Sequence, residues 1–273
     1  MKPPPARAAR RAEPRPLTFK MVRVALLLAV LVVVGLTTCR SRYLSTRWGT
    51  PLFVSIYPIA ADGSPVTRSY LAALDADRFA PIDAFFAREG ARYHVAAADP
   101  VRTRLRAELR QMPPARPANA SLLATAAWSL ELRYWAWRVS GHSGEPEDIR
   151  IFVLYHDPAL TPTVPHSLGL TKGLIGVVYA FASPEMSAEN DVVIAHELLH
   201  TVGATDKYDP ANDAPRFPDG FGDPARSPLF PQPTAELMAG RRMIAPDQWR
   251  QAAGLDEVVI GPATAREIRW PPL

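Results

Sequence analysis

The chain has 273 residues, a formal net charge of +4 and a sequence pI of about 9.4. Its basic groups are concentrated near the N-terminus: residues 1–23 carry a net charge of +6, and three arginines follow within residues 40–47. Since the whole chain is +4, residues 48–273 carry about −5. They lack the basic surface that nucleic-acid binding requires, so we expect no nucleic-acid partner. Cys39 is the sole cysteine, which excludes an intramolecular disulfide and a cysteine-based zinc site.

Residues 1–23 are rich in proline and arginine, a composition typical of a disordered tail. They precede an uncharged apolar run at 24–39, which as a helix would span about 24 Å, against about 30 Å for a hydrocarbon core. We expect this run to be a transmembrane signal anchor. A cleaved signal peptide and a lipoprotein attached through Cys39 are the alternatives. The basic flank predicts a cytoplasmic N-terminus, with residues 48–273 on the extracytoplasmic side.

The folded region 48–273 begins with a predicted strand at 52–59, which is rich in β-branched and aromatic residues and bounded by prolines. Helical spacing of apolar residues then predicts a helix over 67–88, kinked or divided by Pro81 and ending near Gly90. Residues 101–111 predict a short basic helix that ends at a proline pair.

The middle of the chain is dominated by an aromatic segment at 121–139 that contains three tryptophans. We interpret it as a core segment and not as a platform that stacks RNA bases or sugars, because half-buried aromatic residues dominate protein cores. Residues 149–155 and 173–183 predict two strands. Ser187 is a suitable N-cap for the helix that follows.

The C-terminal part contains a proline-rich stretch at 209–234 without regular periodicity, which predicts a long functional or mobile loop. Residues 245–254 predict a short final helix with a proline near its first position. Residues 267–270 predict a strand or a packing tail.

The segment from Ile194 to Tyr208 carries the strongest chemical signal. It contains His196, Glu197 and His200 in the pattern His-Glu-x-x-His, on a helix that is apolar around most of its circumference. The two histidines lie one turn apart on one face, so both imidazoles can reach one metal ion. Such a helix is buried, and polar groups on it are costly unless they are paired or coordinated. The pattern therefore predicts a metal site.

The motif resembles the metzincin clan of zinc endopeptidases, whose extended pattern is His-Glu-x-x-His-x-x-Gly-x-x-His followed by a Met-turn. The matching residues are His196, Glu197, His200 and Gly203. The third ligand position holds Asp206, as in snapalysin-type members, and Met238 matches the Met-turn methionine. The resemblance covers about residues 150–254 and also implies that the strand at 173–183 is an edge strand that pairs with extended substrate.

Some assignments within the motif region remain open in the sequence. Glu236 is an alternative third ligand, in which case Asp206 would orient a histidine. The position two residues after Met238, often Tyr in metzincins, is Gly240, and Tyr208 is a candidate transition-state stabiliser. Lone histidines are more often structural than ligating, so we expect His156 and His166 to lie outside the site.

The resemblance implies an α+β, metzincin-like fold with a mixed twisted sheet and an active-site helix, and the apolar run predicts one transmembrane helix at 24–39 before it. The resemblance also implies a metallopeptidase that binds Zn²⁺ and a peptide or protein substrate, with Glu197 as general base. Together with the apolar run, it predicts a membrane-anchored enzyme. The alternative is a catalytically inactive membrane-anchored protein with a structural metal site.

Overall fold

The computed structural model describes residues 21–28, 32, 35, 47–117, 121–141, 144–170 and 174–273. The chain separates into two units, Met1–Arg40 and Ser41–Leu273. The second unit contains the predicted domain at 48–273.

The expected transmembrane helix at 24–39 is contradicted: among the described residues, no helix is long and apolar enough to cross a membrane. Of the described residues in this region, 21–28, 32 and 35 are helical. Most of the predicted segment beyond residue 28, and the predicted tail up to residue 20, lie outside the described residues.

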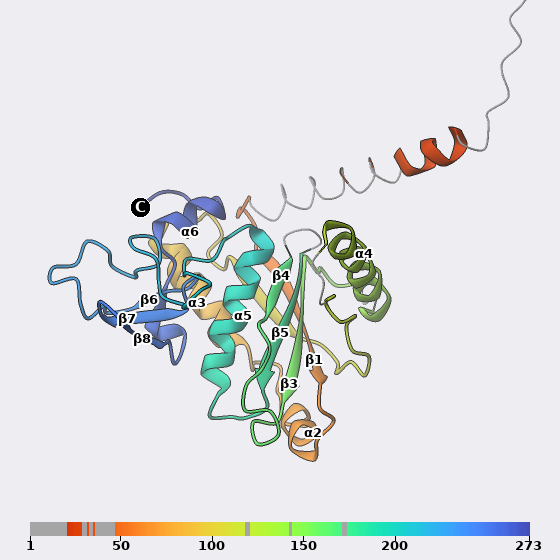
Figure 1. The fold of residues 1–273 in the computed structure, drawn as a ribbon, viewed down its shortest axis with the longest axis horizontal. Coiled ribbons are helices and arrows are strands. Elements are labelled where there is room, and N and C mark those ends of the chain that lie inside the picture. Colours follow the sequence, from red (N-terminus) through yellow and green to blue (C-terminus); the bar gives the residue numbers. More distant parts are fainter. Residues whose placement is uncertain are drawn as a thin grey trace, which may run out of the picture. The chain divides into compact units, whose positions relative to one another are not determined.

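The second unit is built on a five-stranded mixed sheet with the strand order β2-β1-β3-β5-β4 (Figure 1). The first four strands of that order are mutually parallel, and β4 pairs antiparallel with β5 at one edge. Their bounds are β1 Leu52–Ala60, β2 Val101–Leu105, β3 Ile149–His156, β4 Leu168–Leu170 and β5 Ile175–Phe181. The expected α+β class with a mixed sheet is confirmed.

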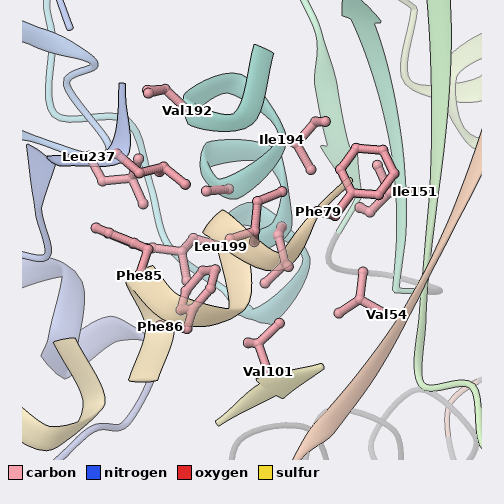
Figure 2. Packing of buried hydrophobic residues seen from close by; sticks show 14 of the residues in the cluster. Val54, Phe79, Phe85, Phe86, Val101, Ile151, Val192, Ile194, Leu199 and Leu237 are labelled. Carbon is pink, nitrogen blue, oxygen red and sulfur yellow. The ribbon is translucent and has the colours of Figure 1, made fainter. Parts of the chain in front are cut away.

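Helices cover both faces of this sheet, and the central strands are therefore buried on both sides. On one face lie α2 (Pro65–Ala72), α3 (Ala80–Arg92) and α5 (Ser187–Val202), and on the other α4 (Leu122–Val139). Alternation along β1 shows the two layers: Ile56 belongs to the larger core with α3 and α5, and Tyr57 belongs to the smaller core under α4. Figure 2 shows the larger core, where Phe85 and Phe86 lie beside Leu199.

The C-terminal part adds small elements beside α5. The strands β6 (Ala235–Glu236) and β9 (Val258–Val259) pair in parallel, and β7 (Arg241–Ala245) and β8 (Gln248–Gln251) form a hairpin. A 3₁₀ turn at Leu255–Glu257 and the helix α6 (Pro262–Glu267) complete the chain. Trp270 follows α6 and packs edge-on against Trp48, with ring centroids 5.6 Å apart.

Two predicted helices are wrong because strand pairing determines the conformation of those residues. The sequence Val-Arg-Thr-Arg-Leu at 101–105 forms β2, in which Val101 is buried and Arg102 is exposed, the alternation of an edge strand. Residues 245–254 contain β8, which pairs with β7. Residues 267–270, expected to be a strand or a packing tail, form no strand: Glu267 is the last residue of α6, and the next three residues follow the helix.

Smaller corrections concern helix ends and the sheet edge. Pro81 does mark a division, since α2 and α3 are separate, but α3 continues past Gly90. This glycine allows close packing instead of ending the helix, because a Cβ there would lie 2.6 Å from Pro100 Cγ. The helix α5 has Met186 as N-cap, so Ser187 is its first residue. The strand β5, predicted to be an edge, lies between β3 and β4.

The two faces of α4 give a stability prediction with a matched control. Leu132 is fully buried under the sheet, whereas Leu123 on the same helix is 85% exposed. We expect Leu132→Ala to lower the free energy of unfolding by about 2–5 kcal/mol, since it leaves a cavity. Leu123→Ala should change it by less than about 0.5 kcal/mol. Urea denaturation measures both, and equal effects would contradict this placement of α4.

Candidate metal centre

The helix α5 positions two of the site residues through its burial. Ile194, Ala195, Leu198 and Leu199 are fully buried on either side of the motif, so the helix is fixed against the sheet and against α3. The helix ends at Gly203, whose φ of 113° lies in the left-handed region that favours glycine. This turn reverses the chain, so that Asp206 returns to the face carrying the histidines.

The structure brings His196, His200 and Asp206 together at one point. Asp206 Oδ1 lies 3.2 Å from His196 Nε2 and 3.1 Å from His200 Nε2. The two imidazole rings are nearly perpendicular, with centroids 4.7 Å apart. A tetrahedral zinc site with bonds of about 2.0 Å has its ligand atoms about 3.3 Å apart, so this spacing fits such a site.

Hydrogen bonds on the far side of each ring fix how the imidazoles face this point. His196 Nδ1 lies 3.0 Å from the Leu237 carbonyl oxygen, and His200 Nδ1 lies 2.9 Å from that of Ala204. A carbonyl can only accept, so both Nδ1 atoms donate. In the neutral rings the Nε2 lone pairs then face the carboxylate, and three acceptors converge. A cation satisfies all three, and two imidazoles with one carboxylate are a donor set suited to Zn²⁺.

The ionisation of Asp206 agrees with this arrangement. Burial acts to raise the pKa of Asp206, but hydrogen bonds with His196 and His200 outweigh it and hold the pKa well below its usual range. Burial acts to lower the pKa of His200, and its contact with Asp206 raises it above the ordinary value. The surroundings of Asp206 thus favour the ionised carboxylate, the form that binds a metal ion.

Glu197 borders the same point from within the protein. Its side chain is buried, burial raises its pKa, and Oε2 has no hydrogen-bond partner within the described residues. The side chains of His196, Glu197 and His200 each offer one ligand atom, and these three atoms lie within 4.8 Å of one another. Glu197 is therefore also within reach of an ion that the two histidines share. Asp206 Oδ1 directly approaches both Nε2 atoms, which is the position expected of a third ligand.

Glu236 has a different environment from the one expected of a third ligand. It is fully buried, and both of its oxygens already accept hydrogen bonds. Oε2 accepts from the amides of Met238 and Ala239, and Oε1 from the Gly261 amide and the Thr264 hydroxyl. Burial raises the pKa of this carboxyl. Its contacts fix the turn at 236–239, whose Leu237 carbonyl in turn holds His196.

Met238 lies in that same turn and is fully buried. Its carbonyl accepts a hydrogen bond of 3.0 Å from the Lys207 amide, the residue after Asp206. The Lys207 ammonium lies 2.8 Å from Glu267 Oε2 and also donates to the carbonyl and hydroxyl oxygens of Thr205. The turn containing Met238 and the helix α6 therefore hold the segment that presents Asp206.

A cleft of about 230 Å³ opens over this centre and is lined by His196, Glu197, Tyr208 and His166, among others. Burial and the nearby Asp206 charge raise the pKa of Tyr208, and Arg241 lies over its ring at 5.6 Å. The structure thus places the candidate stabiliser Tyr208 in the cleft. It also places His166 there, contrary to expectation, since a lone histidine in a loop gives no local signal of such a position.

Comparisons with known proteins assign no family to the chain. No family model matches it, and no curated protein matches it.

The assignment of the third ligand can be tested with two carboxylate variants. We expect Asp206→Ala to weaken Zn²⁺ binding by at least about a hundredfold, since even the loss of a residue that only orients a ligand costs about 10–100-fold. Glu236→Gln should retain one bound zinc, but lower the free energy of unfolding by about 1–3 kcal/mol by depriving buried donors of their acceptor. Competition with a chromophoric chelator and urea denaturation measure the two effects. Zinc loss in Glu236→Gln alone would reverse the assignment.

Proposed function

We propose that this chain is a zinc-dependent peptidase of metzincin-like form. The observation that carries the proposal is the position of Glu197, a buried carboxylate with an unpartnered oxygen beside two histidines and an aspartate that converge on one point. A closed structural zinc site uses four protein ligands, whereas catalytic sites keep one position open. Here His196 and the carboxylate of Glu197 line an open cleft, which supports a catalytic role.

In the proposed mechanism His196, His200 and Asp206 hold Zn²⁺. An ion bound there would supply Lewis-acid chemistry, which would activate water and polarise the carbonyl of the scissile bond. Glu197 accepts a proton from the attacking water and donates it to the leaving amine. Burial raises the pKa of the Glu197 carboxyl above its ordinary value, and a general base must be able both to accept and to release a proton. The Tyr208 hydroxyl is the candidate donor to the developing oxyanion.

The edge strand β4 is the proposed backbone partner of an extended peptide. It is the last strand of the sheet as described, so one side of it is available for strand addition. Gly169 in its centre faces the active-site helix: a Cβ there would lie 2.5 Å from His200 Cβ and 3.2 Å from Glu197 Oε2. This close packing sets the bound peptide beside the metal ligands. It replaces β5 as the substrate-binding strand, because β4 covers β5.

The role of Glu197 can be tested by separating metal binding from catalysis. We expect Glu197→Gln to retain one zinc per chain but to lower kcat for a degenerate peptide library by about 10²–10⁴-fold, the usual contribution of a general base. Glu185→Gln is a matched control, since Glu185 is exposed in the loop before α5. Mass spectrometry of the products and metal analysis provide the readouts.

The outcomes of that experiment separate the two hypotheses for this site. Equal cleavage by the wild type and Glu197→Gln would show that Glu197 is not the base. If neither cleaves while both hold zinc, the metal has a structural role, and the alternative of an inactive metal-binding protein stands.

A further inference from the structure

A second cavity lies on the opposite face of the sheet from α5, next to the edge strand β4. It has a volume of about 270 Å³ and is walled by Trp128 of α4, Leu154 of β3, Val177 of β5 and Leu168 of β4. The segment before β4 separates it from the cleft over the metal centre, and Pro165, His166 and Tyr179 line both spaces. We call it the α4-side cavity. Because Leu168 of β4 forms part of its wall, the α4-side cavity borders the strand that we propose to bind substrate.

The geometry of β4 determines which part of a bound peptide would face this cavity. Successive side chains of a strand point to opposite faces, and residues paired directly across two strands point to the same face. Gly169 faces Glu197 and His200, whereas Leu168 packs with the core under α4. A peptide residue paired with Gly169 therefore faces the metal centre. Its neighbour, paired with Leu168, points toward the α4-side cavity.

The walls of the cavity select for an apolar group. Trp128, Leu154 and Val177 are buried apolar side chains, and Leu168 is partly buried with them. His156 also lines the cavity, and burial lowers the pKa of its ring. The one charged side chain in the lining besides the histidines is Arg116, which is exposed. An apolar cavity of about 150 Å³ is already sufficient to bind benzene, so this one can accommodate one large side chain.

We propose that the α4-side cavity is a specificity subsite that binds a large apolar side chain of an extended peptide, at the position adjacent to the residue facing Glu197. The inference rests on the proposed peptidase function and adds its substrate class: peptides with a bulky apolar residue at this one position. The cavity holds that side chain on the face opposite the metal centre, and so fixes the register of the peptide on β4.

A blocking substitution tests the subsite. Ala115 lines the cavity and is exposed, so Ala115→Trp narrows the entrance without altering the core. Peptides in which one Phe is moved along an otherwise Ala, Gly and Ser sequence should show one position where Phe raises kcat/KM by about tenfold or more over Ala. In Ala115→Trp this gain of Phe over Ala should fall to less than about threefold.

A matched control separates blocking from a general effect of a new tryptophan. Ala127 is exposed on α4 but does not line the cavity, so Ala127→Trp should retain the full Phe preference. Urea denaturation of both variants establishes that they are folded. Met112, exposed and also lining the cavity, provides a second blocking variant, Met112→Trp. An unchanged Phe preference in both blocking variants would overturn the proposal.

Binding measurements keep the subsite testable apart from catalysis. Fluorescence anisotropy of the same labelled peptides on zinc-loaded Glu197→Gln should show tighter binding of the favoured Phe peptide than of the Ala peptide, with the difference lost when Ala115→Trp is added. If the wild type cleaves no peptide but this binding difference appears, the peptidase function fails and the subsite stands. If neither cleavage nor binding distinguishes Phe from Ala at any position, the subsite is overturned.

Discussion

The packing of α5 against the sheet is the constraint on which the candidate metal centre depends. This helix carries two imidazoles and a carboxylate into the interior, and their mutual placement follows from where its ends are fixed. At its N-terminal end, Arg78 pairs with the buried Asp191 at 3.0 Å, and Asn190 exchanges hydrogen bonds with the backbone of Phe181 in β5. At the other end, Gly203 turns the chain back. A shift at either end would move both Nε2 atoms away from Asp206.

The region after the long loop completes this centre without supplying a ligand of its own. The buried carboxylate of Glu236 ties the turn at 236–239 to the beginning of α6, and that turn presents the Leu237 carbonyl to His196. The helix α6 supplies Glu267, which fixes Thr205 and Lys207 on either side of Asp206. Hydrogen bonds of this kind orient ligands before a metal binds, so the entropy of ordering them is lost on folding and not on binding. The elements from β6 to α6 thus hold His196 and the segment around Asp206 in position.

The sequence predicted the parts of the structure that local pattern determines. The strands β1, β3 and β5 and the helix α5 are long enough for periodicity to identify them, and Gly203 marks a left-handed turn that glycine favours. The strands β2, β4 and β8 have five, three and four residues, and their conformation depends on partners far away in the chain. For that reason two of them were predicted as helices, and β4 was missed altogether.

The same distinction explains which site residues the sequence could identify. His196, His200 and Asp206 lie within eleven consecutive residues, so helix geometry and one turn bring them together. The choice between Asp206 and Glu236 could not be made from spacing, because it depends on four donors that only the folded chain supplies to Glu236. His166 enters the cleft only because β4 follows it and packs on α5.

The short strand β4 connects the edge of the sheet with the candidate metal centre and with the α4-side cavity. Because Gly169 has no side chain, β4 can approach α5 closely enough to border Glu197, and Leu168 and Leu170 on its other face pack with the core under α4. A Cβ at position 169 would lie only 2.4 Å from the backbone oxygen of Glu197. Either the backbone of α5 or the edge of the sheet would therefore have to move, and both are packed against the core. One glycine therefore couples the position of the sheet edge to that of the general base proposed here, and through Leu168 to the α4-side cavity as well.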